Sequence, residues 1–318
     1  MHDALARHWG LADAELEYLP VGFGSHHWRA VDRHGTCRFV TADDLMAGFQ
    51  AGDDADTAFR ALERAYGTAA ALREHGLEFV LSPLPDDEGA VIRRLDERYA
   101  VSAAVFVDGE SAGFGDYESP DERRSIAGVV GRLHAATEHV GAELPRRDDF
   151  VLPCRDGLVV ALGDLDGTWD SGPFGEPTRR LLSAKADAVE RRLADYDECV
   201  AAILARPVPW VVTHGEPHRA NVLRDREGRV HLVDWDTTLL APRERDLSMV
   251  LDEALTGWDE YRAAAGDVEL DEQAIELYRR RWELADIAIF AVDFRQPHDR
   301  TDDTVVAFDG LNGYLGDL

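Results

Sequence analysis

Three polar residues in the back half of the chain have the types and spacing needed to transfer a phosphoryl group. Glu216 lies five residues before Asn221 in the run HGEPHRAN (214–221), and Asp234 follows thirteen residues later. In such an arrangement the first carboxylate orients and deprotonates an acceptor hydroxyl, while the amide oxygen and the second carboxylate bind magnesium beside nucleotide phosphates. Positioning and charge neutralisation do most of the work in this chemistry. We therefore predict Glu216 as the catalytic residue and Asn221 and Asp234 as metal ligands.

The elements that would position these residues follow from hydrophobic periodicity. A short apolar strand at 210–214 precedes the loop, and strands at 222–224 and 230–233 are expected to pair and return Asp234 toward Asn221. A long helix is expected at 56–75, where apolar residues recur every three or four positions. The other expected strands are 28–31, 37–41, 78–82 and 99–107. The other expected helices are 3–14, 120–137, 178–205 and most of the chain after 243, with an irregular connection at 145–177.

The order of these motifs resembles that of the aminoglycoside phosphotransferase and choline kinase superfamily. The pattern His-Gly-acid-x-x-x-x-Asn, followed by a strand ending in VDWD (233–236), is similar to its catalytic signature, and PRERDL (242–247) and RLH (132–134) resemble two further segments. The spectinomycin phosphotransferase-like branch is the most similar. This resemblance implies an α+β, bilobal, protein-kinase-like fold. A small β-rich N-lobe with one long helix (1–107) would bind nucleotide, and a larger, mostly helical C-lobe (108–318) would hold the catalytic loop, metal and acceptor.

The resemblance also implies a nucleotide site for ATP or GTP. The loop containing Gly22, Gly24 and Ser25 would cover the phosphates with backbone N–H groups, because glycine permits close approach. A Gly-x-Gly between strands is more often only a turn. Val105 and Val107, in the link between the lobes, would contact the purine, although a buried edge strand fits the same residues.

Two positions depart from the family pattern. Thr41 stands at the end of a strand where the resemblance implies a lysine that pairs with the α- and β-phosphates, so one charge-assisted contact worth about 1.5–3 kcal/mol is missing. His26, His27, Arg29 or a second magnesium ion are the candidate substitutes. Glu216 replaces the usual Asp and extends one methylene further, which changes geometry more than pKa.

Acidic and aromatic residues in the expected C-lobe helices are candidates for the acceptor site. Asp252, Glu253 and Asp286 could receive a cationic aminocyclitol or aminoglycoside, and Trp282 could stack on a ring. Ordinary helix surface and core are the commoner uses of such residues. The chain has 34 basic and 62 acidic residues and a net charge of −28, which favours cationic partners and repels nucleic acid and anionic lipid. An acidic surface also serves solubility alone.

The remaining composition excludes several classes of protein. Cys37, Cys154 and Cys199 are widely spaced, so neither a metal cluster nor a disulfide framework is expected, and no signal peptide or membrane span is recognisable. A reducing cytoplasm is the expected location. Two alternatives to antibiotic phosphorylation stay open, namely a choline, homoserine or sugar kinase of metabolism and a catalytically impaired pseudokinase that binds nucleotide or ligand. The acceptor, the choice of ATP or GTP and the oligomeric state have no readable code in the sequence.

Overall fold

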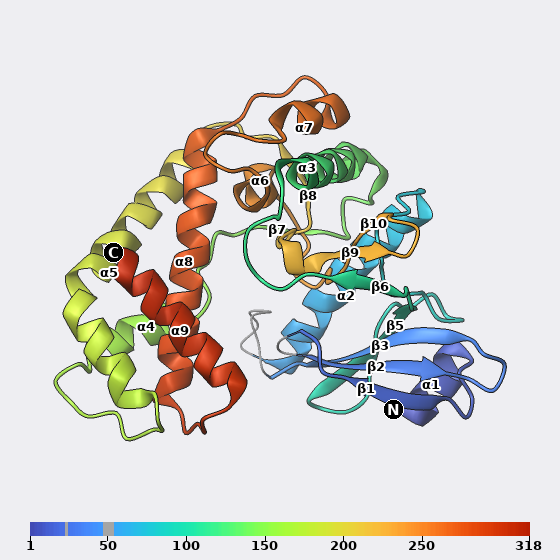
Figure 1. Ribbon diagram of the computed structural model, residues 1–318, viewed down its shortest axis with the longest axis horizontal. Coiled ribbons are helices and arrows are strands. Elements are labelled where there is room, and N and C mark those ends of the chain that lie inside the picture. The colour runs from blue at the N-terminus through green and yellow to red at the C-terminus, as the bar shows by residue number, and fades with distance from the viewer. Residues whose placement is uncertain (23–24, 47–53) are drawn as a thin grey trace. The chain divides into compact units, whose positions relative to one another are not determined.

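The computed structural model describes residues 1–22, 25–46 and 54–318, which fall into two compact units. The first unit combines Met1–Asp148 with Pro209–Leu270, and the second combines Asp149–Val208 with Asp271–Leu318. Every described strand belongs to the first unit, and the second unit is helical (Figure 1). The expected catalytic segment therefore lies, in sequence, between the two stretches that make the second unit.

The front of the chain forms a five-stranded antiparallel sheet in the spatial order β1-β2-β3-β5-β4. Its strands are β1 (Glu15–Leu19), β2 (Ser25–Val31), β3 (Cys37–Asp44), β4 (Arg93–Arg94) and β5 (Tyr99–Val105). Because side chains alternate between the faces of a sheet, Ala30, Val40 and Val101 share one face. They are buried there in a core with Leu5 of helix α1 (His2–Trp9).

Helix α2 (Ala55–Glu74) is the long helix that follows this sheet's first three strands. It begins where the Asp54 side chain accepts a hydrogen bond from the Thr57 N–H at 2.8 Å, a normal N-cap. Its buried residues recur at spacings of three and four, which gives the helix one apolar face: Ala58, Ala61, Leu62, Ala65, Tyr66, Thr68, Ala69 and Leu72.

Two small sheets carry the catalytic segment. One has the order β10-β9-β6 and the other β7-β11-β8. Their strands are β6 (Gly109–Ser111), β7 (Arg146–Arg147), β8 (Trp210–Thr213), β9 (Val222–Asp225), β10 (Val230–Leu232) and β11 (Leu239–Pro242). The β9–β10 hairpin turns at Asp225, whose carboxylate accepts hydrogen bonds from the N–H groups of Glu227 and Arg229 at 3.0 and 2.8 Å.

Helices complete both units. The first unit adds α3 (Pro120–Ala135), the 3₁₀ helices η1 (Ala136–His139) and η2 (Arg219–Asn221), α6 (Glu244–Val250) and α7 (Trp258–Ala265). The second unit consists of α4 (Arg155–Leu162), α5 (Gly175–Leu204), α8 (Glu272–Arg295) and α9 (Asp302–Asp317). Among the described residues, none of the helices combines the length and the apolar character needed to cross a membrane.

The sequence-based expectations hold for the fold class and for most elements. The mixed α+β architecture, the long helix and the β9–β10 hairpin are confirmed. Residues 78–82 were wrongly expected to be a strand, since they make only a single bridge between Val80 and Leu232. The expected irregular stretch at 145–177 contains α4 and β7. The compact units do not follow the boundary at residue 107, so the two-lobe division remains a prediction about function.

Candidate functional site

The catalytic loop after β8 is anchored through its backbone by a buried carboxylate. Asp246 is fully buried, and its two oxygens accept hydrogen bonds from the N–H groups of His214 (2.9 Å) and Gly215 (2.7 Å). His134 of α3 contacts the same carboxylate at 3.0 Å. Burial opposes ionisation of Asp246, yet its bond with His134 and nearby positive charge hold the pKa of Asp246 below its ordinary value. Asp246 therefore fixes the loop in place.

Gly215 is required by this loop for two reasons. Its φ of 102° lies in the region that favours glycine, and an added Cβ would lie 2.4 Å from the guanidinium group of Arg245. That guanidinium is itself held, because it donates to the Thr213 hydroxyl and to the Thr237 carbonyl, both at 2.9 Å. The arginine thus packs directly against the start of the loop.

His214 has a structural role at the start of the loop. Its Nε2 lies 2.8 Å from the carbonyl oxygen of Val233, and its Nδ1 accepts from the N–H of Glu216 at 3.3 Å. Burial lowers the pKa of His214 to about 4, so the ring is neutral near pH 7. It therefore joins the catalytic loop to the residue just before Asp234.

Glu216 and Asn221 come together within the loop. The Asn221 amide nitrogen donates to the Glu216 carbonyl oxygen at 3.0 Å, which leaves the amide oxygen as the group able to bind a cation. A Glu216 carboxylate oxygen lies 3.7 Å from His218 Nε2. Burial opposes ionisation of Glu216, but His218 lowers its pKa by hydrogen bonding and charge, with a further contribution from Arg245. The buried Tyr117 hydroxyl donates to the Pro217 carbonyl and steadies the same turn.

Asp234 follows β10 in an unusual backbone conformation. Its φ of 65° is left-handed, a region that Asp tolerates better than most residues. The N–H of the preceding Val233 donates to the Asn221 carbonyl at 3.1 Å, so the two expected metal ligands are joined through adjacent backbone. Burial and the negative charges of Asp236 and Glu216 raise the pKa of Asp234 well above its ordinary value. A cation would relieve this repulsion.

The donor set suits magnesium bound together with phosphates. Within 1–22, 25–46 and 54–318, no three His, Cys, Asp or Glu side chains are grouped to hold an ion by themselves. The protein would supply the Asn221 amide oxygen and the Asp234 carboxylate, with phosphates and water completing the shell. Mg²⁺ beside nucleotides is usually bound in this way.

The expected phosphate-covering loop is only partly described. Gly24 lies outside the described residues. Gly22 ends the segment after β1 with a φ of 72°, and Ser25 opens β2, where its hydroxyl donates to Asp43 at 2.9 Å. Two valines are expected to contact the purine. Val105 is the last residue of β5, and 43% of its surface is exposed, whereas Val107, two residues later, is partly buried.

Thr41, at the position of the implied lysine, contacts a neutral histidine. Its hydroxyl lies 3.2 Å from His27 Nδ1, and burial, together with the charge of His26, lowers the pKa of His27 to about 4. Arg29 is engaged elsewhere, since it pairs with Glu17 at 3.4 Å and lies over the Phe106 ring. Neither His27 nor Arg29 is thus positioned as a cationic substitute for the lysine.

Asp43 is a buried acid on the same face of β3 as Thr41, and the sequence reasoning missed it. It is 5% exposed, and Tyr66 of α2 donates to both of its carboxylate oxygens at 3.2 Å. Burial and the charge of Asp236 raise the pKa of Asp43 to about 7. Strand alternation was the signal that could have found it, because residues two apart on β3 share a face and Thr41 had already been singled out.

The four acceptor candidates divide between the two units. Asp252 accepts a hydrogen bond from the Thr256 N–H at 2.8 Å and pairs with Arg123 at 3.4 Å, and Glu253 beside it is exposed; both belong to the first unit. Asp252 therefore has a structural use.

Trp282 and Asp286 lie on α8 of the second unit. Both interact with Tyr314, a residue that the sequence reasoning missed. The Trp282 Nε1–H donates to the Tyr314 hydroxyl of α9 at 3.0 Å. Burial, then the charge and hydrogen bond of Asp286, raises the pKa of Tyr314. The structure therefore brings an indole, a phenol and a carboxylate together. Tyr314 lies too far along the chain for helical periodicity to reveal it.

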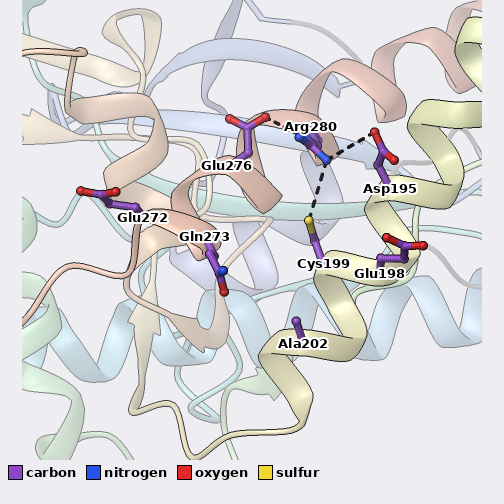
Figure 2. Close-up of a pocket in the computed structure, with 8 residues that line it drawn as sticks. All are labelled: Asp195, Glu198, Cys199, Ala202, Glu272, Gln273, Glu276 and Arg280. Carbon is purple, nitrogen blue, oxygen red and sulfur yellow. Dashed lines mark hydrogen bonds and ion pairs between the residues drawn. The ribbon is translucent and has the colours of Figure 1, made fainter.

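An acidic cavity of about 520 Å³ also lies between α5 and α8 in the second unit (Figure 2). Arg280 spans it, with Glu276 at 2.8 Å, Asp195 at 3.7 Å and the Cys199 sulfur at 3.8 Å. None of the residues predicted for the site lines this cavity.

The fold and the loop geometry together define a kinase-like phosphotransferase. A family model described as the phosphotransferase enzyme family, APH, matches residues 52–284. The chain belongs to this family and is a small-molecule kinase, as the sequence resemblance implied.

Individual proteins are similar to this chain in sequence or in fold. Protein StrN of Streptomyces griseus is 28% identical over 313 residues, which cover 94% of this chain and 86% of StrN. The structure of spectinomycin phosphotransferase APH(9)-Ia, in complex with ADP and spectinomycin, has a TM-score of 0.75 at 16% identity and covers 99% of this chain and 95% of its own. Amicoumacin kinase, in complex with AMP-PNP and Ca²⁺, has a TM-score of 0.60 at 13% identity, with 95% and 88% covered.

Proposed function

We propose that this protein is a magnesium-dependent O-phosphotransferase. It moves the γ-phosphate of ATP or GTP to a hydroxyl of a small molecule, an aminoglycoside- or aminocyclitol-like antibiotic or another natural product. The observation that carries the proposal is the geometry of the loop from Glu216 to Asp234. Short backbone contacts hold the ionised carboxylate of Glu216, the amide oxygen of Asn221 and the carboxylate of Asp234, which lies near other acids. The ADP and spectinomycin in the complex of the similar spectinomycin phosphotransferase support the same reaction class.

The proposed reaction assigns one step to each group. Glu216, its pKa lowered beside His218, accepts the proton of the acceptor hydroxyl. The acceptor oxygen bonds to the γ-phosphorus, the bond from that phosphorus to the bridging oxygen breaks, and the nucleoside diphosphate leaves. Magnesium, when bound by Asn221 and Asp234, neutralises phosphate charge. Gly22 and Ser25 cover the phosphates next to Thr41, and Val105 and Val107 contact the base.

The acceptor is proposed to be cationic. Trp282, Asp286 and Tyr314 of the second unit form a polar aromatic cluster that suits an amine-bearing ring. A protein that uses ATP or GTP and a small antibiotic would act in the cytoplasm and would confer resistance or self-protection.

The second candidate is a pseudokinase. Thr41 and Asp43 place a hydroxyl and a carboxylate on the strand where the resemblance implies a lysine, and this favours weakened phosphate binding. The metabolic alternative, phosphorylation of choline, homoserine or a sugar, differs from the leading proposal only in the acceptor.

Calorimetric titration with ATP and GTP, with and without magnesium, separates these candidates. Magnesium-dependent micromolar binding by the wild type, lost in Asp234→Asn, supports the enzyme. Absence of binding at millimolar nucleotide rejects the enzyme and leaves only a pseudokinase that binds another ligand, whereas nucleotide binding without phosphoryl transfer to any acceptor indicates a pseudokinase that binds nucleotide. For a binding-competent chain, mass spectrometry of an acceptor panel follows, with aminocyclitols beside choline, homoserine and sugars. A gain of one phosphoryl group identifies the acceptor class.

The acceptor cluster has a matched test. Asp286→Asn should raise the KM for a cationic acceptor several-fold and leave the KM for nucleotide unchanged. Asp309→Asn, an exposed acid on α9, should leave both constants at wild-type values. Equal effects of the two variants would remove Asp286 from the acceptor site.

A further inference from the structure

Strand β3 and helix α2 do not form the ion pair that usually joins these elements in kinases. In protein kinases a β3 lysine pairs with a glutamate of the following helix, and the pair must form for the nucleotide to be held correctly. Here Thr41 stands at the lysine position, and Glu63 of α2, the candidate partner, is exposed. Some other contact has to tie α2 to the sheet beside the nucleotide site.

Asp43 provides such a contact. It follows Thr41 by two residues on β3, so both side chains lie on the same face of the sheet, opposite the face that packs on α1. Tyr66 reaches it from α2, with its hydroxyl 3.2 Å from each carboxylate oxygen, and Ser25 reaches it from the start of β2 at 2.9 Å. A single buried carboxylate therefore joins the helix, the strand and the end of the phosphate-covering loop.

The network also borders the expected metal ligands. The charge of Asp236 contributes to the raised pKa of Asp43, and the charges of Asp236 and Asp234 contribute to the raised pKa of Tyr66, after burial in both cases. The acids after β10 thus act electrostatically on the network. All of these residues belong to the first unit.

We propose that Asp43 is a positioning residue that replaces the lysine–glutamate pair. Held by Tyr66 and Ser25, its carboxylate fixes α2 and the start of β2 against β3, so that the nucleotide phosphates are placed over Asp234. This inference rests on the proposed phosphotransferase function. It differs from a merely structural role because it predicts an effect on nucleotide binding that is separate from stability.

The test compares variants of the hydrogen-bonded hydroxyls with a matched control. Tyr66→Phe removes one hydroxyl and leaves the ring, and Tyr18→Phe makes the same change at an exposed position of β1 in the same sheet. Magnesium–nucleotide affinity is measured by calorimetry, and kcat and both KM values are measured with an accepted substrate. Tyr66→Phe should weaken nucleotide binding about 3–10-fold, as expected for one lost hydrogen bond, and leave the acceptor KM unchanged. Tyr18→Phe should match the wild type.

Replacement of the carboxylate supplies a rescue comparison. Asp43→Asn keeps the size of the side chain and one of its two acceptor oxygens, so it should retain more nucleotide affinity than Asp43→Ala. Wild-type affinity in both Tyr66→Phe and Asp43→Ala, whatever their melting temperatures, would overturn the positioning role while leaving the proposed function intact. A wild-type chain that binds no nucleotide would instead overturn the proposed function, and this inference with it.

Discussion

Glu216 and Asp234 carry carboxylates whose surroundings push their pKa values in opposite directions. His218 lowers the pKa of Glu216 against the effect of burial, whereas burial and neighbouring acids raise the pKa of Asp234. Divergent environments of this kind separate the roles of two like groups. The ionised Glu216 suits proton abstraction, and Asp234 suits a cation that would stabilise its charged form.

At the residue scale, we predict that Glu216 cannot be exchanged even for aspartate. Glu216→Gln should lower kcat about 10²–10⁴-fold because the proton acceptor is lost. Glu216→Asp should lower kcat about 100-fold, because Asp246 holds the loop in place and the shorter side chain no longer reaches the acceptor hydroxyl. Steady-state kinetics on both variants, with Glu190→Gln at an exposed position of α5 as control, measures this. A wild-type rate in Glu216→Asp would mean that the loop adjusts.

At the scale of elements, α3 and α7 approach so closely that a glycine is needed between them. A Cβ added at Gly131 would lie 2.7 Å from the Tyr261 carbonyl oxygen and 2.8 Å from the Ala264 Cβ. The Tyr261 hydroxyl oxygen lies 2.8 Å from Nδ1 of His134, and His134 also contacts Asp246. The packing of two helices is thereby connected to the position of the catalytic loop.

This contact predicts opposite effects at two glycines of α3. Gly131→Ala should lower the free energy of unfolding by about 1–3 kcal/mol because the helices must separate. Gly128→Ala, three residues earlier, should raise it by about 0.5–1 kcal/mol through helix propensity, since its Cβ would approach no atom closer than 3.9 Å. Chemical denaturation of both variants distinguishes the effects. If the two variants had equal free energies of unfolding, α7 would have moved away from α3 without loss of stability.

At the scale of the whole molecule, the net charge of −28 opposes compaction. We predict that the melting temperature at pH 7 rises as NaCl is increased from about 10 mM to about 0.3 M, because shorter Debye lengths screen repulsion among acids. Thermal melts near pH 4.7, where the net charge is close to zero, provide the internal control and should lose this rise. A melting temperature that falls with salt at pH 7 would mean that attractive ion pairs dominate the surface.

The amino-acid sequence by itself was enough to predict the residues of the proposed catalytic segment. Glu216 lies in the loop after β8, Asn221 ends the 3₁₀ helix η2 just before β9, and Asp234 follows β10, and such local geometry follows from residue spacing and turn chemistry. The absent lysine at Thr41 was equally readable, because it needs only the register of a single strand. The fold class and the family followed from the order of these segments.

Only the tertiary structure decided which distant residues contact the predicted ones. Ser25, Asp43 and Tyr66 come from three elements, and Trp282 and Tyr314 come from two helices, so their contacts depend on how those elements pack. It also assigned Asp252 to a structural pair with Arg123. The physical reason is that periodicity fixes which face of an element a side chain occupies, whereas its partner across a packed interface is set by the path of the intervening chain.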